Sequence, residues 1–204
     1  SYLLIIALLF ALFGLGSRHC PIPSDAIICD FVMRPYNLFE APHIFLFTLF
    51  SSFWFHNSPD HILLTAALIV VFLQTAEIRI GTKRAMIAVF SIHALVVVIM
   101  TLYLHVGDYL NPEVDWYEFG LRGRNYMGGS VGLFGVGGVL FSQIKRPIAG
   151  ALLYFGFEAW NAYIYEGAAL YVSMGHVTAF TLGFMLGRYW LHQDSKQFGA
   201  AELN

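Results

Sequence analysis

Residues 125–141, NYMGGSVGLFGVGGVLF, combine six glycines with one serine in a segment that is otherwise apolar. The whole chain is similarly apolar: of its 204 residues 58% are hydrophobic and 12% are charged, and its mean hydropathy is +0.65. These values lie outside the range of soluble globular domains and inside the range of membrane proteins. The sequence therefore predicts an all-α membrane protein, with the glycine-rich segment as one of its spans.

Apolar runs bounded by charged residues predict six membrane-spanning helices. A bilayer core of about 30 Å needs roughly 20 residues of helix. The predicted spans lie near residues 2–17, 59–77, 85–105, 127–143, 147–165 and 168–190. Because no repeat or low-complexity linker divides the series, we expect a single membrane domain over residues 1–204, folded as a six-helix bundle.

The distribution of Lys and Arg predicts the orientation of this bundle. Seven of these residues follow the second, fourth and sixth spans, namely Arg79, Lys83, Arg84, Lys145, Arg146, Arg188 and Lys196. The opposite loops hold four, diluted by most of the acidic residues, namely Arg18, Arg34, Arg122 and Arg124. Since Lys and Arg gather on the cytoplasmic side, we expect both termini there, or on an equivalent side, and the loops 18–58 and 106–126 outside.

The outer loops carry two further features. Cys20 and Cys29 lie in the first loop, where either a disulfide or two free thiols fit the sequence. Segment 43–56 is rich in aromatic residues but too short to span a bilayer, which predicts an interfacial helix or a half-buried loop. The formal charge of -2 gives no sign of a nucleic-acid partner, so the lipid bilayer is the expected environment.

Ser130 and His176 are predicted to lie at the same depth in the membrane. Ser130 is eleven residues from Phe141 at the inner end of its span, a helix rise of roughly 17 Å, which leaves it about 13 Å below the outer surface. His176 is eight residues from Ala168 at the outer end of the last span, roughly 12 Å from the same surface. The serine hydroxyl and the imidazole therefore share a level inside the membrane.

The last span also carries small residues at four-residue spacing, namely Gly175, Ala179, Gly183 and Gly187. This spacing puts them on one face of the helix, beside His176. Small residues let two helices approach closely, and the glycine-rich span offers Gly128, Gly132 and Gly135 for that contact. Such a seam either only packs two helices or also brings Ser130 within reach of the histidine.

A second group of polar residues surrounds the start of the second span. Ser58 is expected to cap this helix, with a proline at the first helical position. His56 lies just before the cap, His61 stands one turn inside, and Thr65 follows four residues later on the same face. Their donors lie near the predicted level of Ser130, which indicates an anion-binding site.

Four motifs together resemble those of the rhomboid family, the six-helix intramembrane serine proteases. In chain order, the family's HxxxxHxxxN is similar to His56, His61 and Thr65, its ExxxG to Glu77 and Gly81, its GxSGxxxG to GGSVGLFG at 128–135, and its AHxxG to GHVTA at 175–179. The motifs keep the family's order and cover most of residues 56–190. The resemblance implies a rhomboid-like six-helix fold.

The resemblance also implies an activity, which is cleavage of transmembrane segments of other membrane proteins near their outer ends. Ser130 would be the nucleophile and His176 its general base, in a dyad without a required acid. His61 and the Ser130 backbone N–H would bind the oxyanion, with Thr65 at the position of the family's Asn. The supporting residues carried over with these motifs are His56, Gly128 and Gly129. Neither a cofactor nor a metal is implied.

Several positions depart from the family pattern. Thr65 offers one hydroxyl where the family has an amide, Val131 replaces the second glycine of GxSG, and Ala179 replaces the glycine of AHxxG. The family's Trp-Arg pair is absent from the segment EAPHIFLF. The alternative is therefore a catalytically silent rhomboid-like protein that binds transmembrane helices or is a structural subunit of a larger membrane complex. Against it, the chain keeps both Ser130 and His176.

Three further polar residues lie inside predicted spans. Glu158 is expected roughly 16 Å into the fifth span, where an acidic residue is a functional candidate. It would either orient His176 as a third group or turn toward water or Asn161. His93 and His105 of the third span could each pair with another histidine as haem ligands, although no spacing requires this.

Overall fold

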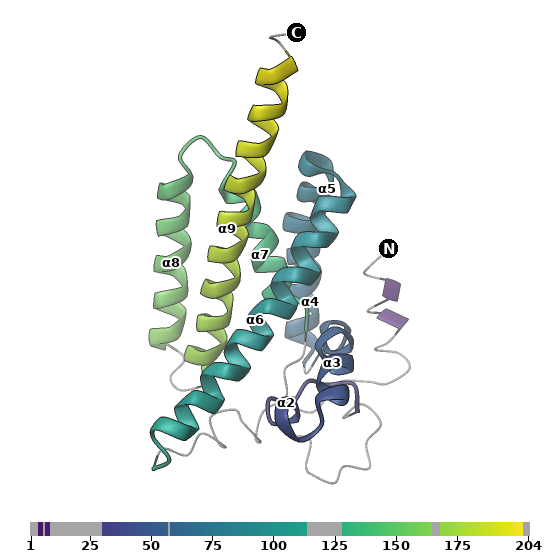
Figure 1. The fold of residues 1–204 in the computed structure, drawn as a ribbon, viewed down its shortest axis with the longest axis vertical. Coiled ribbons are helices and arrows are strands. Elements are labelled where there is room, and N and C mark those ends of the chain that lie inside the picture. The colour runs from purple at the N-terminus through teal and green to yellow at the C-terminus, as the bar shows by residue number, and fades with distance from the viewer. Residues whose placement is uncertain are drawn as a thin grey trace. The chain divides into compact units, whose positions relative to one another are not determined.

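The computed structural model describes residues 4–5, 7–8, 30–56, 58–113, 128–164 and 168–201, and Figure 1 shows its ribbon. The regular elements within these residues are helices, which confirms the predicted all-α class. Contacts divide the chain into two compact units, the first with residues 1–69 and 93–130, the second with 70–92 and 131–204. The single domain over 1–204 stays a prediction.

Five helical stretches occupy the positions of predicted spans. They are α4 (Pro59–Leu68) with the π-helical Ile69–Leu73 and α5 (Gln74–Ile80), α6 (Thr82–Leu110), α7 (Ser130–Phe141), α8 (Pro147–Ile164) and α9 (Ala168–Ala201). α6 and α9 continue beyond their predicted ends, because a helix does not have to stop where its residues become polar. α7 begins three residues later than predicted. The first predicted span, 2–17, and the cysteine pair fall outside the described residues, apart from residues 4–5 and 7–8.

Two of the described helices are long and apolar enough to cross a membrane. They are Pro59–Ile80 and Thr82–Leu110. α7 is apolar but has only 12 residues. Large apolar side chains on several helices are exposed, as expected where lipid replaces water, for example Leu63, Val71, Leu95, Leu153 and Met185. The six-span arrangement stays a prediction.

The first unit contains three short helical elements, in chain order α2 (Asn37–Glu40), α3 (Pro42–Ser51) and the 3-10 turn Ser52–Trp54. Phe45 and Leu49 of α3 pack against Met33 and Val97 in a buried cluster. The other large apolar side chains of α3 are exposed, namely Ile44, Leu46, Phe47 and Phe50. The helix predicted within residues 43–56 is therefore confirmed, and its place at the membrane interface stays a prediction.

Close backbone contacts join α7 and α9 in the second unit. A Cβ added at Gly183 would meet the backbone of Gly135, 3.1 Å from its Cα, and a Cβ at Gly138 would lie 2.8 Å from the backbone nitrogen of Phe184. A Cβ at Gly187 would lie 2.9 Å from a carbonyl oxygen of α7. Since real Cβ atoms do not approach backbone so closely, only glycine fits here. The predicted seam of small residues is confirmed at these positions.

A second contact in this unit lies at the polar end of α9. The two terminal nitrogens of Arg84, near the start of α6, donate to the two carboxylate oxygens of Asp194 at 2.8 and 2.7 Å. The guanidinium carbon also lies 5.5 Å from the ring centroid of Trp190. We call these three residues the Arg84 clamp. Both charged side chains are roughly one-third exposed, so the clamp adds little stability in spite of its good geometry.

Candidate active site

The start of α4 forms as the sequence predicts. The Ser58 hydroxyl accepts a hydrogen bond from the backbone N–H of His61 at 3.2 Å, and Pro59 takes the first helical position. His56 precedes the cap and is 4% exposed. The rings of His56 and His61 meet edge to face, with their centroids 4.9 Å apart. The cap thus fixes the backbone of one histidine of a contacting pair.

Gly128 packs against this histidine pair. A Cβ at Gly128 would overlap the His61 ring, 2.7 Å from its Nε2, and would lie 3.3 Å from Nδ1 of His56. Gly128 also has φ +93°, and its N–H donates to the carbonyl of Ser52 at 2.8 Å. Positive φ favours glycine, so this position needs glycine for two independent reasons. The expectation that Gly128 lines the seam with α9 stays a prediction, whereas its contact with the histidines near the start of α4 is shown.

Ser130 follows two residues later as the first residue of α7 and is 7% exposed. Between them, a Cβ at Gly129 would lie 2.6 Å from Cε2 of Phe53. The positive φ at Gly128 explains why α7 begins at Ser130 rather than at residue 127. A helix start leaves its first backbone N–H groups without helical partners, and these groups favour negative charge. The predicted nucleophile thus lies at the N-terminal end of a helix.

Thr65 and His56 are the remaining polar residues of this group. Thr65 is fully buried, and its hydroxyl makes no hydrogen bond to any of the described residues. Burial, together with the neighbouring His61, lowers the pKa of His56 to about 4. His56 is therefore neutral near pH 7.

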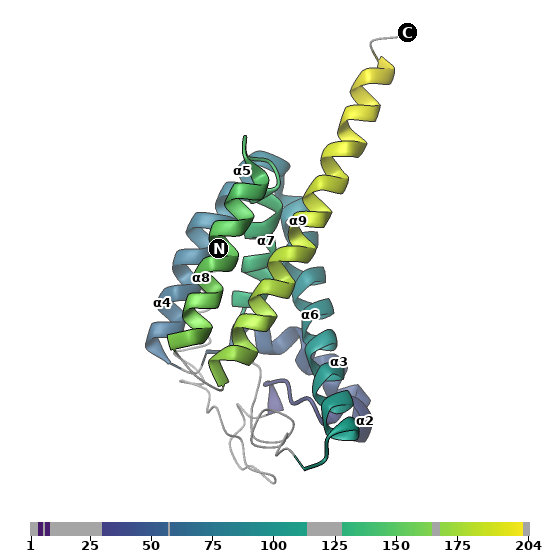
Figure 2. The same ribbon diagram turned by 90° about the vertical axis from the view of Figure 1, so that its left-hand side faces the viewer.

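His176 lies in α9, in the second unit, and contacts an acidic residue. Its Nδ1 is 3.3 Å from Oε1 of Glu158 on α8, and the two residues are 7% and 1% exposed. The hydroxyl of Tyr154, one turn earlier on α8, donates to the same carboxylate oxygen at 3.2 Å. α8 and α9 lie side by side in both views (Figures 1 and 2). The expectation that Glu158 faces His176 is confirmed, and the alternative of a side chain turned to water is wrong.

Aromatic rings enclose the histidine and its acidic partner. The Phe134 ring lies 4.3 Å from the His176 ring between centroids, with an interplanar angle of 39°. Tyr154 stacks on Phe180 of α9 at 4.0 Å and 16°. These contacts restrict the rotation of both the imidazole and the tyrosine that bonds Glu158.

Val131 of α7 lies beside Gly175 of α9 in the second unit. A Cβ at Gly175 would meet only Val131, at 4.0 Å from its Cγ2, which is an ordinary contact distance. The family has a glycine at the position of Val131 and an alanine at the position of Gly175. A small side chain at position 175 would therefore fit beside Val131, so the valine does not depend on a glycine on α9 at this contact.

The predicted site residues thus fall into two groups. Those of the first unit are Ser130, His61, Thr65, His56, Gly128 and Gly129; those of the second are His176 and Glu158. The distance between Ser130 and His176 stays a prediction. The sequence analysis missed Phe134 and Tyr154. Both stand four residues from a predicted site residue on the same helix, Phe134 after Ser130 and Tyr154 before Glu158, and this spacing could have found them.

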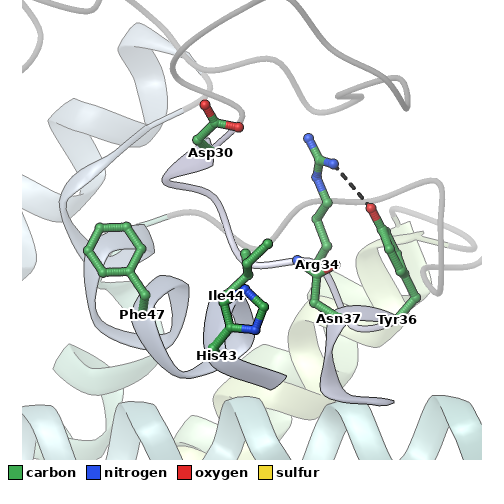
Figure 3. A pocket seen from close by; sticks show the side chains of 7 residues that line it. All are labelled: Asp30, Arg34, Tyr36, Asn37, His43, Ile44 and Phe47. Atoms are coloured by element: carbon green, nitrogen blue, oxygen red, sulfur yellow. Dashed lines mark hydrogen bonds between the residues drawn. The ribbon is translucent and has the colours of Figure 1, made fainter. Parts of the chain in front are cut away.

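A separate hollow of about 420 Å³ lies in the first unit (Figure 3). Its lining residues come from one short stretch of chain, namely Asp30, Arg34, Tyr36, Asn37, His43, Ile44 and Phe47. Figure 3 shows Arg34 extended beside Tyr36, to whose hydroxyl it donates at 3.1 Å. No predicted site residue lines this hollow.

The two histidines considered as haem ligands have other surroundings. His93 is buried against Phe53, at 5.4 Å between ring centroids, and Nε2 of His105 lies 3.1 Å from the carbonyl oxygen of Pro35. Among the described residues, no group of three or more His, Cys, Asp or Glu could hold a metal ion.

Comparisons of the chain with protein families, curated proteins and solved structures found no match. The rhomboid assignment therefore stays a prediction.

Proposed function

We propose that the chain is a rhomboid-type intramembrane serine endopeptidase. The proposal includes six spans, both termini on the cytoplasmic side, and transmembrane segments of other proteins as substrates. Two helices of sufficient length and apolarity support the membrane location. The four motifs in the family's order support the activity.

The observation that carries the proposal is the fit of Gly128 against His61. Any side chain at Gly128 would overlap the ring of His61, so the chain that leads into Ser130 passes directly along this imidazole. Ser130 then begins α7, with its backbone N–H at a helix start. A hydroxyl, a helix start and a histidine are thus assembled in one unit, as oxyanion stabilisation requires.

In the proposed reaction, Ser130 Oγ attacks the carbonyl carbon of the scissile peptide while His176 accepts the hydroxyl proton. The C–N bond then breaks, and His176 gives that proton to the leaving amine. Water next attacks the acyl-enzyme with the same base, which releases the carboxyl product and restores the serine. His61 and the Ser130 N–H would donate to the oxyanion in both steps.

In the proposed reaction, Thr65 is expected to make cleavage slower than an asparagine at this position would. Its buried hydroxyl is one potential donor, where an asparagine amide would offer two N–H groups. A well-placed oxyanion donor contributes about 2.7–4 kcal/mol to transition-state stabilisation, so weaker donation by Thr65 would slow the reaction. The threonine is compatible with a slow protease as well as with a silent one.

Labelling with a fluorophosphonate probe, which reacts with activated serines, tests the proposal. We expect the purified protein in detergent to be labelled at Ser130, and Ser130→Ala and His176→Ala to lose the label. Ser91→Ala is the matched control, because Ser91 is an exposed serine whose hydroxyl bonds the Ile87 carbonyl. Labelling that survives Ser130→Ala would contradict the nucleophile assignment. Absence of both labelling and cleavage of several transmembrane substrates would favour the catalytically silent alternative.

A further inference from the structure

The Glu158 side chain is an exception on its helix. α8 otherwise exposes large apolar side chains, including Leu153, Phe157 and Tyr163, whereas Glu158 is almost fully buried. Burying an ionised carboxylate is costly unless a cation or several donors compensate for the lost hydration. The buried acid therefore requires partners on its own helix or on α9.

The structure supplies these partners around a single oxygen. Oε1 of Glu158 accepts a hydrogen bond from Tyr154 and lies 3.3 Å from His176 Nδ1. An imidazole can attract a carboxylate at Nδ1 only when that nitrogen carries a proton. When Nδ1 carries the proton of a neutral ring, Nε2 on the opposite edge of the ring is an acceptor.

We infer that Glu158 is a positioning residue that holds His176 as the Nδ1–H tautomer and leaves Nε2 as the base. The inference rests on the proposed function and adds a third group to its Ser130–His176 dyad. When Ser130 gives its proton to Nε2, the ring becomes an imidazolium, and the Glu158 carboxylate stabilises that charge without taking a proton. Tyr154 keeps the carboxylate oriented, and Phe134 restricts the ring.

A purely structural ion pair between α8 and α9 would stabilise the fold but would not select a tautomer for catalysis. Glu158→Gln separates the two roles. The amide has nearly the same shape, but its NH2 group can donate to Nδ1 and so favour the opposite tautomer. Asp194→Asn is the matched control, because it also replaces a carboxylate by an amide in a contact of α9, the Arg84 clamp.

The first measurement does not depend on activity. Nitrogen NMR of ¹⁵N-histidine-labelled protein near pH 8 reports which ring nitrogen carries the proton, and His176→Gln assigns the signal. We expect the Nδ1–H form of His176 in the Ser130→Ala background and a shift toward the Nε2–H form when Glu158→Gln is added. The His105 signal and the Asp194→Asn protein should show no change. An Nε2–H tautomer in the parent protein, or no change with Glu158→Gln, would overturn the inference.

The second measurement separates this inference from the proposed function. With a fluorescent transmembrane substrate in bilayers, Glu158→Gln should lower kcat roughly 10- to 100-fold with KM changed less than about twofold. Tyr154→Phe should lower kcat less, and Glu158→Asp should recover part of the loss. An unchanged kcat in Glu158→Gln, with cleavage still dependent on Ser130, would overturn the inference and leave the protease intact. The expected tautomer without any cleavage would support the inference and contradict the protease.

Discussion

The two groups of predicted site residues are held in place by different forces. In the first unit, His61 is fixed by shape, because Gly128 fits against its ring with no space for another atom. In the second unit, His176 is fixed by charge, through a buried carboxylate at 3.3 Å. A contact made by shape is sensitive to added volume, whereas one made by charge is sensitive to protonation and to isosteric changes of charge.

The largest effect should come from adding volume where backbone meets backbone. Gly183→Leu would force α9 away from Gly135 of α7 and lower the free energy of unfolding by at least about 3 kcal/mol. Thermal unfolding in detergent would measure this loss. Gly156→Leu on α8 is the matched control, because a Cβ at Gly156 meets nothing within 4 Å. Equal stability of the two variants would show that close packing on α7 does not position α9, the helix that carries His176.

The next effect concerns the histidine pair. Gly128→Ala should reduce cleavage at least about 100-fold, since the new Cβ displaces His61 from the oxyanion. Gly81→Ala isolates the backbone contribution, because Gly81 also has positive φ, +82°, but no neighbour within 4 Å of an added Cβ. Its expected cost is the strain alone, about 1–3 kcal/mol in thermal unfolding, because its ψ of 152° lies in a region populated almost only by glycine, and cleavage should be unchanged. Similar losses of cleavage in both variants would mean that strain, not contact with His61, limits the site.

A gradual effect, spread over more than two pH units, should follow from acidification. The pKa of His56 is about 4 in the folded chain and 6.5 when exposed, so the unfolded chain binds the proton first as pH falls. The stability from neutral His56 is complete above pH 6.5 and declines toward pH 4, by about 3 kcal/mol in total. His56→Gln should flatten this part of the stability profile. An unchanged profile in His56→Gln would place the pH sensitivity elsewhere.

The smallest effect should come from an exposed charge contact. Asp194→Asn removes one side of the Arg84 clamp, and we expect a small decrease in Tm at low salt that becomes smaller as salt is added. Thermal scans at two salt concentrations measure it. A salt-independent decrease would mean that packing on Trp190, rather than charge, holds the end of α9.

Patterns of local spacing predicted most of the helices. Apolar runs marked the described spans to within a few residues at most ends, Ser58 and Pro59 marked the start of α4, and the four-residue spacing in α9 marked its seam with α7. These signals depend on neighbours along one helix, so a single sequence contains them in full.

Partners distant in the sequence were harder to predict. The sequence analysis assigned Gly128 to the seam with α9. The structure shows that this residue has a positive φ and packs against His61, and neither feature can be predicted from the sequence alone. The sequence analysis left Glu158 between two orientations, because helix period alone does not say which face of α8 meets α9. The proximity of Val131 to Gly175 also became visible only in the structure, because the two residues are far apart in the sequence.

The Gly135–Gly183 contact has a consequence for how the chain can vary. A Cβ at Gly183 would meet the backbone of Gly135, which no substitution at 135 removes, so no second change compensates for replacing Gly183. A Cβ at Gly135 would instead lie 2.6 Å from Cγ2 of Ile92, a clash that a smaller residue at position 92 would relieve. At Gly175, by contrast, a Cβ would meet only Val131, at 4.0 Å. In a saturation mutagenesis screen we therefore expect Gly183 to be invariant, Gly135 to vary only together with Ile92, and Gly175 to tolerate alanine. We expect the glycine contacts between α7 and α9 to stay unchanged among folded variants, while the residues beside Ser130 and His176 vary.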